Sequence, residues 1–182
     1  MDFRDLIRRR QSDRKYVLER PVEEEKLMRI LEAGRLAPSA SNSQPWTFIV
    51  VDEPGLRYKV AKATHGKLIG INKFVIQAPL LIVMVIEKPK FHTQIGGAIK
   101  NKEYPLIDIG IAAEHMCLQA AEDGIGSCML GWFDEKRIKK LLRIPRSKTI
   151  GLVISFGYTP DDYRLREKIR KPFDQVVKRN IY

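Results

Sequence analysis

The stretch Pro38-Ser39-Ala40-Ser41-Asn42-Ser43-Gln44-Pro45-Trp46 is a polar loop of small residues between a helical pattern and an apolar strand pattern. Its hydroxyls, side-chain amides and backbone donors carry little apolar mass, so burying them costs free energy unless polar groups meet them. The loop is therefore a candidate binding segment. The alternative is a surface connection between a helix and a strand, for which serine and asparagine are equally suitable.

The residues before the loop predict a helix over 23–37. Leu27, Ile30 and Leu31 recur at helical spacing, and the acidic residues at the start of the segment have the sign that the helix dipole favours. Proline disrupts a helix that continues through it, so the helix ends at Pro38.

The residues after the loop predict two strands with a helix between them. Trp46–Val51 is a β-branched and aromatic run, which is typical of a strand, and residues 54–64 predict a short helix. Leu80–Ile86 is apolar on both faces, which predicts a strand in the middle of a sheet.

The second half of the chain continues with a helix that is apolar on most sides, over 105–123. Such a helix is buried in a core or at a subunit interface, and we favour the interface. Gly124 and Gly126 predict a turn, Asp134 caps a short basic helix that ends before Pro145, and residues 149–158 predict a buried strand. This order lacks regular βαβ alternation, so the fold class is α+β, in one domain over 1–182.

Composition limits the function classes. Two cysteines, Cys117 and Cys128, and three scattered histidines have no metal-ligand spacing, so no metal site is expected and both thiols are interpreted as buried in a reducing compartment. The charged N-terminus is unlike a signal peptide, and the longest apolar run, Ala78–Ile86, is too short to span a bilayer. We expect a soluble, cytoplasmic protein with no membrane partner.

The formal net charge of +11 raises the alternative of nucleic-acid binding. Residues 136–182 hold 14 Lys and Arg against 4 Asp and Glu, so most of the excess lies in the last quarter of the chain. The sequence has no basic helix with interleaved aromatic residues and no nucleic-acid-binding signature. The basic run that starts at Lys136 is interpreted as the solvated face of a helix whose apolar residues point inward, and no nucleic-acid partner is expected.

Two further clusters accompany the loop. One contains Arg10, Ser12, Arg14 and Tyr16, and the other contains Lys168 and Arg170. Together with Pro38, Ser39, Asn42, Gln44, Pro45 and Trp46, and with the 108–131 segment, they resemble the nitroreductase family of FMN-dependent oxidoreductases. The resemblance covers about residues 3–176. It implies a central, mostly antiparallel sheet flanked by helices, and a homodimer that exchanges its C-terminal tails and shares its active sites.

The resemblance also implies how an FMN would be held. Arginine and lysine are suited to a phosphate, and a cation at the pyrimidine edge of the flavin stabilises the charge that develops there on reduction. Leu130 and Gly131 would offer backbone donors near the ring, and the loop would reach the flavin from the opposite subunit, with Ser41 near the substrate. The cofactor-binding residues implied are Arg10, Lys168 and Arg170 for the phosphate, Ser12 for phosphate or ribityl oxygens, Arg14 for the pyrimidine edge, and Pro38, Ser39, Asn42, Leu130 and Gly131.

The sequence departs from the family pattern at two places. Asn72 and Lys73 are adjacent where many members have an Asn and a Lys three residues apart, and the lid region over 87–104 is short. The chain has no catalytic His, Cys or carboxylate constellation, which agrees with cofactor chemistry. The hypothesis is ping-pong transfer from NADH or NADPH, through FMN, to a nitroaromatic, quinone or similar small acceptor. Reductive dehalogenation or flavin fragmentation on the same fold stays an alternative, and the nicotinamide preference and natural acceptor stay open.

Overall fold

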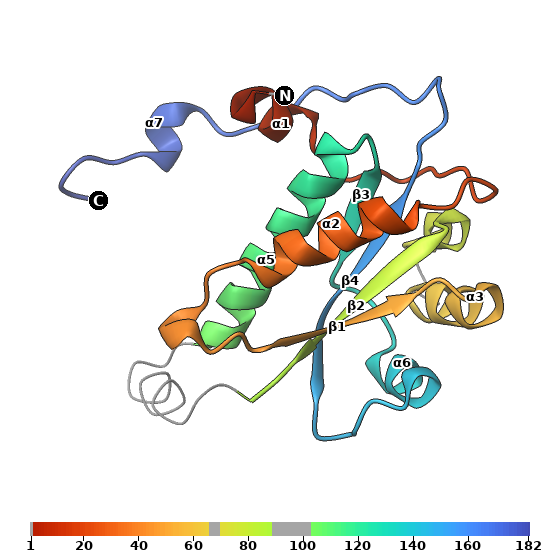
Figure 1. Cartoon of the computed structure of the whole chain (residues 1–182). Coiled ribbons are helices and arrows are strands. Elements are labelled where there is room, and N and C mark those ends of the chain that lie inside the picture. The colour runs from red at the N-terminus through yellow and green to blue at the C-terminus, as the bar shows by residue number, and fades with distance from the viewer. Residues whose placement is uncertain (1, 66–69, 89–102) are drawn as a thin grey trace.

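The computed structural model describes residues 2–65, 70–88 and 103–182 (Figure 1). The fold is α+β as predicted, although α1, β3 and α7 were not expected. In chain order they are α1 (Phe3–Arg9), α2 (Glu24–Arg35), η1 (Ala40–Asn42), β1 (Trp46–Val51), α3 (Pro54–Ala63), η2 (Lys73–Gln77), β2 (Leu80–Ile86), α5 (Tyr104–Glu122), β3 (Gly126–Leu130), α6 (Glu135–Leu142), β4 (Thr149–Gly157) and α7 (Phe173–Val176).

The four strands form one antiparallel sheet in the order β1-β2-β4-β3. Strand β2 lies between β1 and β4, as its doubly apolar pattern predicts, and six of its seven residues are buried. Side chains alternate along it: Val83 joins the core beneath α3 and α6, while Ile82 and Met84 join the core beneath α2 and α5. Helices cover both faces of the sheet (Figure 1), so neither face of β2 meets water.

The prediction of a turn at Gly124 and Gly126 is only half right. Gly124 has a positive φ of 75° and makes the turn, but Gly126 begins strand β3 at the edge of the sheet. A side chain at Gly126 would collide with Asp13, whose Oδ2 lies 2.9 Å from the position of an added Cβ. The glycine therefore serves a close approach of the N-terminal segment, which no pattern local to β3 indicates.

Helix α5 packs along α2, and Gly34 allows their close approach against Met116. Its face toward the sheet is buried, but Leu106 and Ile107 are 48% and 54% exposed. The first turn of the helix is thus apolar on its exposed side as well, which agrees with the predicted interface without showing a partner.

The basic helix α6 is amphipathic as predicted, with Ile138 fully buried and Lys136, Arg137 and Lys140 exposed. Both cysteines are free and buried. Among the described residues, no helix has the length and apolar character needed to cross a bilayer.

The C-terminal tail leaves the sheet after β4, passes α1 and extends away from the rest of the chain to α7 (Figure 1). Its apolar side chains are open to solvent, with Ile169 at 90% and Phe173 at 77% exposure. Exchange of this tail in a homodimer stays a prediction.

Candidate functional site

The segment after α1 adds to the free edge of β3. Ser12 forms a parallel bridge with Ser127, and the neighbouring Asp13 accepts a hydrogen bond from the backbone N–H of Ser127 at Oδ2 (3.1 Å) while donating its own N–H to the carbonyl of Ser127 (2.8 Å). Tyr16 is buried in the core near Cys128, and its hydroxyl donates a hydrogen bond to the carbonyl of Asp13 at 2.9 Å. These contacts hold the Arg10–Arg14 segment in an extended conformation along the strand.

Arg10 lies between this segment and α5. Its side chain is 24% exposed, and the buried Nε lies 3.1 Å from Oε1 of Glu114, in an ion pair that is not aligned as a hydrogen bond. Nε therefore has no hydrogen-bond partner among the described residues. A buried donor of this kind is suited to an added acceptor.

The tail brings its cations to the same place. Nζ of Lys168 donates to the carbonyl of Arg10, and the guanidinium of Arg166 donates to the carbonyl of Ser12. The backbone N–H of Arg166 donates to Oε1 of Gln11 at 3.0 Å. Arg10 and Lys168, which are 158 positions apart in the chain, therefore lie side by side. We call the cations Arg10, Arg166, Lys168 and Arg170, together with the adjacent Ser12, the cation cluster.

Positive charge is in excess in the cation cluster. Burial lowers the pKa of Lys168, the charges of Arg10, Arg170 and Arg166 lower it further, and the carboxylate of Glu114 raises it. Cations that repel one another in this way attract an anion. A phosphate is suited to such a site, because it can accept paired hydrogen bonds from arginine.

Ser12 and Arg14 are also close to Cys128 on β3. Burial raises the pKa of this thiol, while the charge of Arg14 and a hydrogen bond with Ser12 oppose the rise. Two residues further, at the end of β3, Leu130 is buried and Gly131 is exposed. A Cβ at Gly131 would meet nothing within 4 Å, so the space beside its backbone is open in the described chain.

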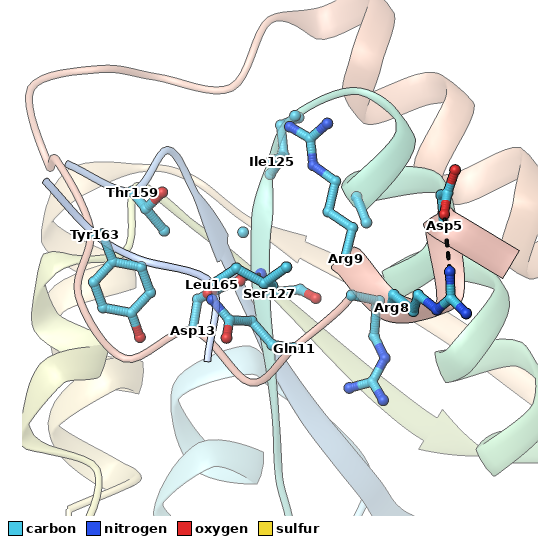
Figure 2. Close-up of a pocket in the computed structure, with 14 residues that line it drawn as sticks. Asp5, Arg8, Arg9, Gln11, Asp13, Ile125, Ser127, Thr159, Tyr163 and Leu165 are labelled. Carbon is cyan, nitrogen blue, oxygen red and sulfur yellow. Dashed lines mark hydrogen bonds and ion pairs between the residues drawn. The ribbon is translucent and has the colours of Figure 1, made fainter. Parts of the chain in front are cut away.

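A cavity of about 520 Å³ lies beside the Arg10–Arg14 segment, between α1, the start of β3 and the tail. Figure 2 shows Gln11, Asp13, Ser127 and Leu165 close together in it, with Tyr163 at one side. Of the predicted cofactor-binding residues only Arg10 lines it. Because the other predicted cofactor-binding residues lie outside its lining, we do not assign this cavity to the cofactor.

The predicted loop lies elsewhere in the same chain, against the N-terminal part of α5, whereas α1 packs near the other end of that helix (Figure 1). Ser39 is half-buried, and Pro38, Ser41 and Asn42 are exposed. One chain therefore brings together Arg10, Ser12, Lys168 and Arg170, with Arg14, Leu130 and Gly131 along β3, but leaves the loop apart from them. That both groups form one site stays a prediction.

Asn72 has a structural contact that the sequence does not reveal. Its amide donates to the carbonyls of Thr64 (3.2 Å) and Trp132 (3.1 Å), so it holds the backbone next to Gly131. The lid region predicted over 87–104 lies mostly outside the described residues.

Sequence reasoning missed Glu114 and Arg166 at the cation cluster, and Asp108 beside the loop. Arg166 had a signal, because Arg164, Arg166, Lys168 and Arg170 alternate at every second position. An extended chain places such residues on one side. Glu114 and Asp108 have no local signal, since each acts on a segment far away in the chain.

The sequence profile of the nitroreductase family matches residues 7–73 and 69–158 of this chain. A relative from Archaeoglobus fulgidus, provisionally named NADH dehydrogenase/NAD(P)H nitroreductase, is 33% identical over 166 residues, which cover 86% of this chain and 85% of the relative.

Solved structures agree. A nitroreductase family protein from Clostridium novyi NT has a TM-score of 0.78 and 32% identity, covering 88% of this chain and 87% of its own. An FMN-dependent nitroreductase from Clostridium difficile has a TM-score of 0.78 and 30% identity, covering 97% of this chain and 98% of its own. With these matches and this antiparallel α+β fold, the chain belongs to the nitroreductase family.

Proposed function

We propose that the protein is an FMN-dependent oxidoreductase that takes reducing equivalents from NADH or NADPH and passes them to a nitroaromatic, quinone or similar small acceptor. The cation cluster is the observation that carries this proposal. Arg10 and Lys168 belong to segments at opposite ends of the chain and meet beside the hydroxyl-bearing Ser12, and among the described residues the carboxylates of Glu114 and Asp13 balance the four cations of the cluster only in part. The relatives' names support the oxidoreductase assignment and the cofactor.

The residues of the cluster fit FMN. Nε of Arg10, which pairs with Glu114 without a hydrogen bond, and the amine of Lys168 would bind the phosphate, with Arg170 adding charge. Ser12 would bind a phosphate or ribityl oxygen. Arg14, further along the N-terminal segment that runs beside β3, would place its charge at the pyrimidine edge. Open space beside Gly131 would let the flavin ring approach the backbone N–H groups at the end of β3.

FMN supplies the two-electron chemistry when it is bound. The chain's own residues bind and orient: the fixed charge of Arg14 stabilises negative charge where reduction builds it up, and it does so without reorganisation during the reaction. No side chain is needed as a dedicated proton donor, because water can supply protons to the acceptor. Ser41 is the residue we place nearest the acceptor.

We further propose that the active unit is a homodimer in which Pro38, Ser39 and Asn42 approach the flavin held by the other chain. The exposed apolar residues at the start of α5 and in the tail support this, since exposed apolar side chains are candidates for burial at an interface. The separation of the loop from the cation cluster within one chain supports it as well.

The experiment is a visible absorption spectrum of protein reconstituted with FMN, followed by anaerobic titration with NADH and with NADPH. We expect bound flavin that one or both nicotinamides bleach. Bound flavin that neither nicotinamide reduces would favour a different reaction on the same fold, and a dimer that stays colourless after addition of FMN would contradict the proposal.

A further inference from the structure

Asp108 is a buried carboxylate in the first turns of α5, with 3% of its surface exposed. Its Oδ1 accepts a hydrogen bond from the backbone N–H of Ala40 at 3.1 Å. Its Oδ2 is buried and has no hydrogen-bond partner among the described residues. A carboxylate with one oxygen left unsatisfied away from water costs free energy of folding.

The segment that Asp108 contacts is strained. Ser41, Asn42 and Gln44 all have positive φ values, of 53°, 49° and 47°. Within the segment, the backbone N–H of Gln44 donates to Oγ of Ser39, and the amide of Gln44 donates to Oδ1 of Asn42. Non-glycine residues persist in this conformation only where their surroundings determine it.

The contact with Asp108 links this strained segment to the helix that forms the scaffold. Ala40 is the first residue of η1, so fixing its N–H fixes the start of the turn that contains Ser41 and Asn42. A polar group that is kept in a protein interior at a cost in stability is typical of a functional site.

We infer that Asp108 is a positioning residue, which holds the Ser39–Asn42 segment in the geometry that the cofactor and acceptor site requires. The effect on FMN and acceptor binding rests on the proposed function, whereas the role of Asp108 in holding Ala40 does not. Asp108 does not touch the reacting groups; it acts through Ala40.

Two substitutions separate positioning from simple packing. Asp108→Asn keeps an acceptor oxygen for Ala40, and Asp108→Leu removes it while filling similar space. Asp123→Asn is the control, because Asp123 also lies beside α5 and ties it to Arg29 on α2 (2.8 Å), far from the loop.

The first readout is hydrogen exchange of the Ala40 amide without any ligand. We expect protection in the wild type, Asp108→Asn and Asp123→Asn, and roughly 10-fold faster exchange in Asp108→Leu, in proportion to the lost hydrogen bond. Equal exchange in all four proteins would overturn the positioning role, even if FMN binds as proposed.

The second readout is the affinity for FMN and the KM for a quinone acceptor, measured beside the melting temperature. We expect Asp108→Leu to weaken FMN binding roughly 10-fold and to raise KM, with a melting temperature equal to or above that of the wild type, because the unsatisfied carboxylate is gone. Asp123→Asn should lower the melting temperature and leave FMN affinity unchanged. A lower melting temperature with unchanged FMN affinity in Asp108→Leu would mean that Asp108 is only structural.

Ala40→Pro supplies the complementary change. It removes the N–H at the first position of η1, where proline is tolerated, and the extended backbone of Ser39 is compatible with a following proline. In this background the additional effect of Asp108→Leu on FMN affinity should vanish, because the two residues act through one hydrogen bond. Additive effects would contradict action through Ala40. If the wild type itself binds no FMN, the proposed function fails, and hydrogen exchange alone decides the positioning role.

Discussion

Nζ of Lys168 donates a hydrogen bond to the backbone carbonyl of Arg10, which lies 158 positions earlier in the chain. This contact closes the tail over the N-terminal segment and leaves the cation of Lys168 beside that of Arg10. The two positive charges repel each other, so we propose that an anion bound by both side chains stabilises this arrangement.

Arg10→Ala should weaken FMN binding by about 1.5–3 kcal/mol, or roughly 10- to 100-fold, because it removes a charge-assisted hydrogen bond to the phosphate. The affinity can be measured from the quenching of FMN fluorescence on titration with apoprotein. Arg8→Ala is the matched control, since Arg8 is an exposed arginine of α1, two residues before Arg10, and pairs with Asp5 at 3.4 Å. Equal affinities of the two variants would remove Arg10 from the site.

FMN affinity should fall as the pH rises and Lys168 loses its proton. Because burial and neighbouring cations lower the pKa of Lys168, this fall should begin at a lower pH than for an ordinary lysine. Above that pKa the free protein has lost the charge that the phosphate needs, whereas the phosphate itself keeps its charge. Without the anion the sign is opposite: in this range the unfolded chain binds more protons, so the contribution of Lys168 to the free energy of unfolding rises with pH.

The check is the FMN dissociation constant measured from about pH 8 to about pH 10 for the wild type and for Lys168→Arg, whose guanidinium stays charged throughout. The arginine variant should lose the pH dependence. A wild-type affinity that does not change over this range would exclude Lys168 as a charged ligand of the phosphate.

Mixed dimers should test the sharing of the site. Arg10→Ala and Asn42→Ala homodimers should each bind FMN weakly at both sites. A mixed dimer with one variant in each chain has one site with both changes and one with neither, so about half of the wild-type binding capacity should return. Calorimetric titration of separately tagged mixed dimers measures this capacity. No recovery would mean that Arg10 and Asn42 serve a site within one chain.

Ile107→Asp should dissociate the proposed dimer, because it places a charge in the exposed apolar face of α5. Leu36→Asp, at an exposed leucine next to the end of α2, is the control. Sedimentation analysis should show monomers for the first and dimers for the second. If Ile107→Asp stays dimeric, the interface lies on another surface.

Local patterns predicted the sheet interior well. Leu80–Ile86 is apolar at every position, and a strand covered by helices on both sides can bury such a run. This is where β2 lies, with six of its seven residues buried. The loop between α2 and β1 and the segment at Arg10 also stand out by their residue types alone.

The features that the sequence did not predict depend on contacts between residues far apart in the chain. Strand β3 was missed because its first glycine serves the approach of Asp13, more than a hundred residues earlier. Asp108 was not recognised as an anchor of the loop, since its partner is the backbone of Ala40, and a backbone N–H leaves no mark on the sequence. The alternation of cations at Arg166 and Lys168 could have been detected, had the tail been interpreted as an extended chain.

The affinity of the apoprotein for FMN compared with riboflavin tests the central claim most directly, because the two ligands differ only in the phosphate that Arg10 and Lys168 are proposed to bind. We predict that FMN binds roughly 100-fold more tightly than riboflavin, and that the double substitution Arg10→Ala with Lys168→Ala removes most of this difference. Equal affinities for FMN and riboflavin in the wild type would contradict the account.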